Sequence, residues 1–168
     1  MSLSKGIVVS VWDGIVNFAK AKKAGFVFAL CRLGFGAYSS QIDNYYERNC
    51  ENAKAAGLKV GAYWQTYARN ARMARVEAAG CLVVLDNLKE KQLDLPIYID
   101  ATNAEIAKAF CDELQAAGYN AAVLKRGEKV LIDGVPVSTT EVKIKTKKTA
   151  AKQPADAPVS DEKEQGVN

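Results

Sequence analysis

The chain has 168 residues, of which 49% are hydrophobic and 25% charged, a composition typical of one globular domain with a real core. Its formal net charge is +4, and acidic residues separate the basic ones until the last quarter, so we expect no nucleic-acid partner. The chain contains no histidine, which excludes histidine triads and imidazole metal sites, and we expect neither a metal nor a cofactor.

The cysteines, Cys31, Cys50, Cys81 and Cys111, are widely spaced within apolar or helical patterns. We interpret them as buried, reduced thiols, because a free cysteine behaves as a small hydrophobe. A cysteine nucleophile without a histidine base is the weaker alternative.

Strands alternate with helices through the first 124 residues. Ala-Gly pairs at 24–25, 56–57 and 117–118 each end a helical pattern, as glycine does just beyond a helix. Their spacing fits repeats of about 31 residues, the period of a strand plus its helix. The pattern predicts strands at 6–10, 26–32, 58–64, 96–100 and 119–124, and helices at about 14–24, 43–56, 69–88 and 103–117.

The predicted strands are almost continuously apolar, which is typical of strands buried on both faces of a parallel sheet. The fold class is therefore α/β, a partial TIM-like β/α barrel of about five parallel βα units. An eight-stranded barrel usually needs at least about 200 residues, so three units are missing and an apolar sheet edge is left open. We expect either residues 128–147 or another subunit to cover that edge, which favours a homo-oligomer or a larger assembly.

A different pattern begins after residue 124. Segments 129–132 and 135–137 flank Asp133-Gly134 and predict a β-hairpin with a type I′ turn. The alternation of apolar residues and lysines over 142–147 predicts a third short strand. From about residue 149 the chain has too few apolar residues to fold. We divide it into a barrel domain (1–124), a hairpin extension (125–148) and a disordered charged tail (149–168).

Several segments then match one family in order and spacing. They are 6–12 (GIVVSVW), 32–36 (RLGFG), 53–64 (AKAAGLKVGAYW), 77–78 (EA), 96–100 (PIYID) and 110–111 (FC) with 117–119 (AGY). Together they resemble the glycoside hydrolase family 25 lysozymes over about residues 5–124. The resemblance implies a barrel related to the TIM barrel and hydrolysis of the β-1,4 bond between N-acetylmuramic acid and N-acetylglucosamine in bacterial peptidoglycan. Members are often phage endolysins or bacterial cell-wall enzymes.

The family places an aspartate in the first strand, within Gly-Ile-Asp-Val-Ser, and an Asp-x-Glu pair at the end of the fourth. Carried across, only Asp100 survives as an acid; the glutamate position holds Thr102 and the first-strand aspartate position holds Val8. Since a general acid alone supplies about 10²–10⁴ in rate, we expect very little hydrolysis.

Thr102 has a structural interpretation as well. Thr102 and Glu105 have the spacing of a capping box at the start of a helix. Asp13 and Asp43, which could replace the lost acids, are more simply a loop charge and a helix N-cap.

Aromatic side chains near the predicted strand ends are candidate sugar-binding groups, although core packing explains each of them equally well. They are Trp12, Tyr63, Trp64, Tyr67 and Tyr98.

The leading hypothesis is a degenerate, truncated lysozyme relative that binds peptidoglycan or serves as a structural component, for example of a phage particle. One alternative is a weakly active muramidase that relies on Asp100, and another is a pure assembly protein. No stretch approaches the roughly 20 apolar residues of a membrane span, and no secretory signal is recognised. We therefore expect synthesis in the cytoplasm, followed by incorporation into a virion or release to the cell wall.

Overall fold

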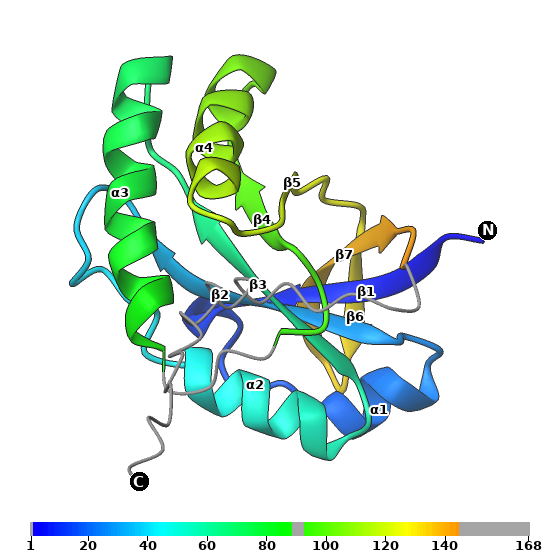
Figure 1. The fold of residues 1–168 in the computed structure, drawn as a ribbon. Helices are drawn as coiled ribbons and strands as arrows, with labels where there is room; N and C mark the ends of the chain where they lie inside the picture. The colour runs from blue at the N-terminus through cyan, green and yellow to red at the C-terminus, as the bar shows by residue number, and fades with distance from the viewer. Residues whose placement is uncertain (1, 89–92, 145–168) are drawn as a thin grey trace, which may run out of the picture.

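The computed structural model describes residues 2–88 and 93–144. The predicted tail, 149–168, lies outside these ranges. Within them, the strands form one twisted sheet in the order β5-β4-β3-β2-β1-β7-β6, and Figure 1 shows α3 and α4 on one side of the strands and α1 and α2 below them. The strands are β1 (Ser4–Val9), β2 (Phe28–Phe35), β3 (Lys59–Gln65), β4 (Ile97–Asp100), β5 (Ala121–Val123), β6 (Lys129–Ile132) and β7 (Val135–Val142). The helices are α1 (Phe18–Lys23), α2 (Tyr46–Ala55), α3 (Ala71–Asn87) and α4 (Ala104–Ala116), with a 3₁₀ turn, η1 (Val11–Asp13), after β1.

Strands β1 to β5 are parallel and consecutive, which confirms the predicted βα units. The first predicted helix, 14–24, is different: the chain forms η1, then Gly14 with a φ of +65°, and only then α1 from Phe18. A left-handed residue ends the first turn, so the helix cannot begin at position 14.

The hairpin is confirmed. Asp133 and Gly134 have φ values of 52° and 79°, as a type I′ turn requires. Strand β7 then pairs antiparallel with β1, from Val8 opposite Ser138 to Ser4 opposite Val142. The hairpin therefore covers the outer edge of β1.

The third strand predicted from residue 142 is wrong for its described part. Val142 is the last residue of β7, and residues 143–144 are not in a strand. The alternating pattern begins at the end of an existing strand, because Val142 of β7 still pairs with Ser4 of β1. Residues 145–147 lie outside the described ranges.

The sheet buries apolar side chains on both faces. A large cluster joins one face to the helices and includes Ile7, Cys31, Trp64, Ile99 and Phe110. A smaller cluster lies on the other face, called the inner face below: strand residues Val8, Phe28, Leu30, Tyr63 and Tyr98, with Leu95 just before β4 and Leu124 just after β5. Burial on both faces is the reason that the strands read as continuous apolar runs.

The connection between β5 and β6 crosses to β7. The Thr140 hydroxyl donates to the Lys125 carbonyl (2.7 Å), and the Gly127 N–H donates to the Thr139 carbonyl (2.6 Å). Strands β5 and β6 are the ends of the sheet order, and no ladder joins them within residues 2–88 and 93–144. This crossing holds Arg126 beside the ends of the parallel strands.

None of the helices in the described ranges is long and apolar enough to cross a membrane.

Candidate functional site

Parallel strands of this kind present functional side chains where they end, at their carboxyl ends. Asp100 is the last residue of β4 and pairs in register with Gln65, the last residue of β3. One layer deeper, Tyr63 lies between Arg32 of β2 and Tyr98 of β4. The inner face is therefore apolar along the strands and polar at their carboxyl ends. These ends, with Gln65 and Asp100, form the rim of the sheet, which is the candidate site.

Arg126 binds Asp100 at this rim. Its Nε and Nη2 donate hydrogen bonds to Asp100 Oδ2, at 3.1 and 2.8 Å, and Nη2 lies 3.4 Å from the Tyr63 hydroxyl. The guanidinium carbon is 5.3 Å from the centre of the Tyr63 ring, within cation–π range. Burial raises the pKa of Tyr63 to about 12, although the Arg126 charge opposes that shift. The surviving family acid therefore has a fixed cationic partner.

A second ion pair lies deeper. Arg32 Nε is 2.8 Å from Asp43 Oδ2, and Arg32 Nη1 donates to Gln65 Oε1 at 2.9 Å. The two charged side chains are only 3% and 0% exposed. Asp43 also accepts the backbone N–H groups of Val11 (3.0 Å) and Tyr45 (2.8 Å), so its carboxylate is satisfied. This network ties the loop before α2 to the ends of β1 and β3.

Asp43 is therefore not the N-cap that the sequence predicts. Helix α2 has Tyr45 at its N-cap, without a side-chain hydrogen bond. Asp43 lies earlier and is used as the counter-ion of Arg32. A buried arginine needs such a partner, because an unpaired charge is costly to bury.

The end of β2 is shaped by a bulge between Arg32 and Gly34. A Cβ on Gly34 would lie 2.5 Å from both the Gln41 carbonyl oxygen and the Trp64 ring. Glycine at this position allows the loop and the indole to approach the strand, and Trp64 Nε1 donates to the Gly36 carbonyl at 3.1 Å.

Asp13 is half-buried rather than a plain loop charge. Its carboxylate accepts the Ser10 N–H at 2.7 Å, while the Ser10 hydroxyl accepts the Trp12 N–H at 3.2 Å, which caps η1. Burial raises the pKa of Asp13 above 3.8, and the Ser10 hydrogen bond and the charges of Arg126 and Lys129 oppose that shift. The positive charge of Arg126, which binds Asp100, therefore also lowers the pKa of Asp13 against the effect of burial.

The two positions without acids lie in different surroundings. Val8 is 1% exposed within the inner apolar cluster. Thr102 is exposed, just beyond β4. The N-cap of α4 is Asn103, whose Oδ1 accepts the Ile106 N–H at 2.9 Å, so the predicted Thr102 cap is wrong. Asn103 has the extended backbone of an N-cap, which starts the helix one residue later.

The structure separates the five aromatic candidates. Trp12 and Tyr67 are 84% and 55% exposed, and the Tyr67 ring meets Phe35 edge-on at 6.1 Å. Tyr63 and Tyr98 are buried on the inner face, and Trp64 is buried in the helix-facing cluster. Only Trp12 and Tyr67 among these five present a large surface to solvent.

Cysteines and acidic residues are the side chains through which this histidine-free chain could carry thiol or metal chemistry. Within the described ranges, no group of three or more Cys, Asp or Glu residues could hold a metal ion. The four cysteines are reduced thiols, of which Cys31, Cys81 and Cys111 are buried. Burial raises the pKa of Cys111 to about 11, which keeps it protonated at neutral pH.

Comparison with known proteins identifies the family. The model of "Glycosyl hydrolases family 25" matches residues 7–133. No curated protein matches the sequence. Among solved structures, the autolysin LytC from Streptococcus pneumoniae in complex with a synthetic peptidoglycan ligand superposes with a TM-score of 0.65 at 17% identity, covering 83% of this chain and 46% of that one.

Two further structures show the same fold. The CTP1L endolysin gives a TM-score of 0.61 at 16% identity, covering 85% of this chain and 67% of that one. A family 25 lysozyme from Aspergillus fumigatus gives 0.56 at 20% identity, covering 73% and 65%. The chain thus spans about half of the autolysin and about two thirds of the other two. With the family model covering most of its length, the chain belongs to family 25 of the glycosyl hydrolases.

Proposed function

We propose that this family 25 protein binds peptidoglycan or a related glycan without appreciable hydrolysis, as a structural or wall-binding component. The observation that carries the proposal is the pair of hydrogen bonds from Arg126 to Asp100 Oδ2. Glycosidic cleavage needs two carboxyl groups with different tasks. Here the acid that matches the family motif is held by a cation, and Val8 and Thr102 supply no second one.

Binding a glycan does not require the two carboxyl groups that cleavage requires. Trp12 and Tyr67 expose aromatic faces beside the rim, and such faces stack on the apolar sides of sugar rings. The family membership supports a glycan ligand. The LytC structure, described as a complex with a synthetic peptidoglycan ligand, supports peptidoglycan as the first ligand to test.

One observation favours a second candidate, a weak muramidase. Asp13 is a half-buried carboxyl at the same rim, with a pKa raised by burial, as a general acid requires. Its carboxylate is nevertheless engaged by the Ser10 N–H, which makes structural capping the simpler role.

The two functions separate in one experiment on purified bacterial cell walls. Turbidity is followed for the full chain, for Asp100→Asn and for Asp13→Asn, with an active family 25 lysozyme as positive control, and sedimented walls are assayed for bound protein. We expect binding without clearing. Clearing by the wild type that either variant abolishes would replace this proposal by the muramidase, and no retention on walls would leave only an assembly role.

We extend the proposal to location: the protein acts in a virion or at the cell wall. Immunodetection in purified particles and in wall fractions tests this, and recovery only from the remaining cytoplasmic fraction contradicts it.

A further inference from the structure

Helix α3 presents an apolar stripe to solvent on the side opposite its buried face. Its buried residues are Ala74, Glu77, Ala78, Cys81, Val84 and Leu85. Val76 and Val83, by contrast, are 58% and 50% exposed, and Ala79 between them is also exposed. The exposed positions are spaced alternately by four and three residues, which is the repeat of a helix-pairing seam: Arg72, Val76, Ala79, Val83 and Asp86.

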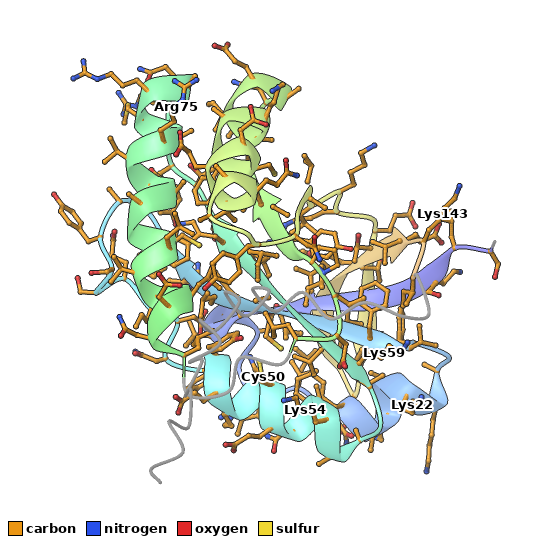
Figure 2. All side chains as sticks on the ribbon, in the orientation of Figure 1. Lys22, Cys50, Lys54, Lys59, Arg75 and Lys143 are labelled. Atoms are coloured by element: carbon orange, nitrogen blue, oxygen red, sulfur yellow. The ribbon has the colours of Figure 1, made fainter. Side chains whose placement is uncertain are left out.

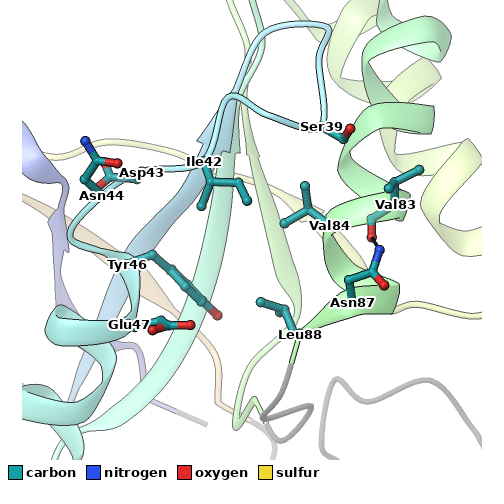
Figure 3. A pocket seen from close by; sticks show the side chains of 10 residues that line it. All are labelled: Ser39, Ile42, Asp43, Asn44, Tyr46, Glu47, Val83, Val84, Asn87 and Leu88. Atoms are coloured by element: carbon teal, nitrogen blue, oxygen red, sulfur yellow. Dashed lines mark hydrogen bonds between the residues drawn. The ribbon is translucent and has the colours of Figure 1, made fainter.

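Neighbouring apolar groups widen this stripe. The loop after β2 lies against α3, because a Cβ on Gly80 would be 2.8 Å from the Ala37 carbonyl oxygen. In that loop Tyr38 is 70% and Ile42 46% exposed. Figure 3 shows Ile42 facing Val84 across a hollow of about 480 Å³, which Val83 and Leu88 also line. Single exposed apolar residues are ordinary, but a grouped set marks an interaction surface.

The two ends of the stripe carry opposite charge. Exposed Arg69 and Arg72 lie just before and in the first turn of α3. Arg75, which Figure 2 shows near the upper end of the helix, is paired within the chain, with its Nε 3.6 Å from Glu113 Oε1. Asp86 lies in the last turn, where its Oδ1 accepts a hydrogen bond from the Tyr119 hydroxyl at 2.6 Å, and Glu47 lines the adjoining hollow. A surface that is basic at one end, apolar in the middle and acidic at the other is complementary to itself after a half-turn.

From this self-complementarity we propose that α3 forms a two-fold homodimer by pairing antiparallel with α3 of a second copy. Val76 of one copy then packs against Val83 of the other, and Ala79 lies near the axis, where a small side chain permits close helix approach. The arginine end of each helix meets the Asp86 end of its partner, and the two helix dipoles are also antiparallel. This interface is independent of glycan binding.

The test is the solution mass of the full chain, by light scattering and sedimentation, across about a hundredfold range of concentration that brackets micromolar dissociation constants. The wild type should be a concentration-dependent dimer. Val83→Lys should weaken the dimer by about tenfold or more, because it places a charge in the apolar centre. Leu131→Lys is the matched control: Leu131 is 72% exposed on the end strand β6, and its change should leave the mass unaltered.

Disulfide trapping tests the direction of pairing. Ala79→Cys should give a covalent dimer on mild oxidation, because the two copies of position 79 meet near the axis. Arg72→Cys should not, since the two copies of that position lie at opposite ends. A monomer at every concentration, a dimer that survives Val83→Lys, a dimer that Leu131→Lys dissociates, or cross-linking at position 72 instead of 79 overturns the proposal. Circular dichroism confirms that each variant is folded.

Discussion

Arg126 and Asp100 meet through a forked contact in which two guanidinium nitrogens donate to the same carboxylate oxygen, at 3.1 and 2.8 Å. The pair is partly exposed, 35% for the arginine side chain and 22% for the aspartate. The contact places a positive charge where a lysozyme of this family would use a free carboxylate.

Supplying a second carboxyl group and releasing the first should create hydrolysis. The double variant Thr102→Glu with Arg126→Ala does both, while Val8 is left unchanged because a carboxyl there would be buried among apolar groups. We expect wall clearing to rise by about 10²-fold or more over the wild type, the usual contribution of a general acid. The matched variant Thr102→Gln with Arg126→Ala carries no acid, and equal clearing by the two variants would contradict the reasoning.

The two ion pairs should differ in their effect on stability. Asp43→Asn leaves the buried Arg32 without its counter-ion and should lower the free energy of unfolding by about 3–5 kcal/mol. Asp100→Asn disturbs a partly exposed pair and should cost about 1 kcal/mol or less. Chemical denaturation measures both. Asp112→Asn, in an exposed pair with Lys108, is the reference, and a larger loss for Asp100→Asn than for Asp43→Asn would reverse our ranking.

Trp12 should report glycan binding directly. Its side chain is 84% exposed, so Trp12→Ala should leave the free energy of unfolding nearly unchanged while reducing retention on cell walls about tenfold. Tyr67→Ala should act in the same direction. Leu131→Ala is the control, because Leu131 is 72% exposed on the end strand β6 and belongs neither to the rim aromatics nor to the α3 stripe. Undiminished retention of the Trp12 and Tyr67 variants would exclude the rim aromatics from binding.

Asp13 and Asp133 should titrate on opposite sides of the ordinary aspartate pKa. Burial raises the pKa of Asp13, whereas hydrogen bonds from Lys20 and Asn17 lower that of Asp133. As pH falls, protonation of Asp13 therefore favours the folded state, with the gain complete below the unfolded pKa of about 3.8. Asp133 instead contributes stability above that value, which is lost as pH falls through its lower, folded-state pKa.

Carboxyl ¹³C NMR between about pH 6 and about pH 2 measures both titrations, with Asp13→Asn and Asp133→Asn as assignment controls. Asp13 should take up its proton first on acidification. The opposite order would mean that the charges of Arg126 and Lys129 outweigh burial at Asp13.

The sheet was predictable because its evidence is local. A strand buried on both faces must be apolar along its length, and a glycine after each helix marks the change to the next strand. The ends of helices and strands were predicted wrongly where the same residues fit two different local structures. Thr102 and Asn103 are both good capping residues, and only the backbone shows that Asn103 is used. Alternation after residue 141 likewise fits either a new strand or the end of β7.

The site was predictable only in part, because its pairings are not local. Asp100 follows from the family motif at the end of β4. Its partner Arg126 is brought to the rim by a connection that crosses to β7, which no periodicity reveals. Arg32 carried a usable signal, a charge inside an apolar strand, but nothing in the pattern says that Asp43 is its counter-ion rather than a helix cap.

The antiparallel pairing of β1 with β7 also determines the order in which the chain can be completed. Ser4 finds its partner only when Val142 has been made. Until then β1 has β2 on one side and bare backbone on the other, and pairing over so great a sequence distance is slow. Nascent and truncated chains that end before β7 should therefore aggregate through the open edge of β1 and need a chaperone, whereas a chain that includes β7 covers this edge with its own hairpin.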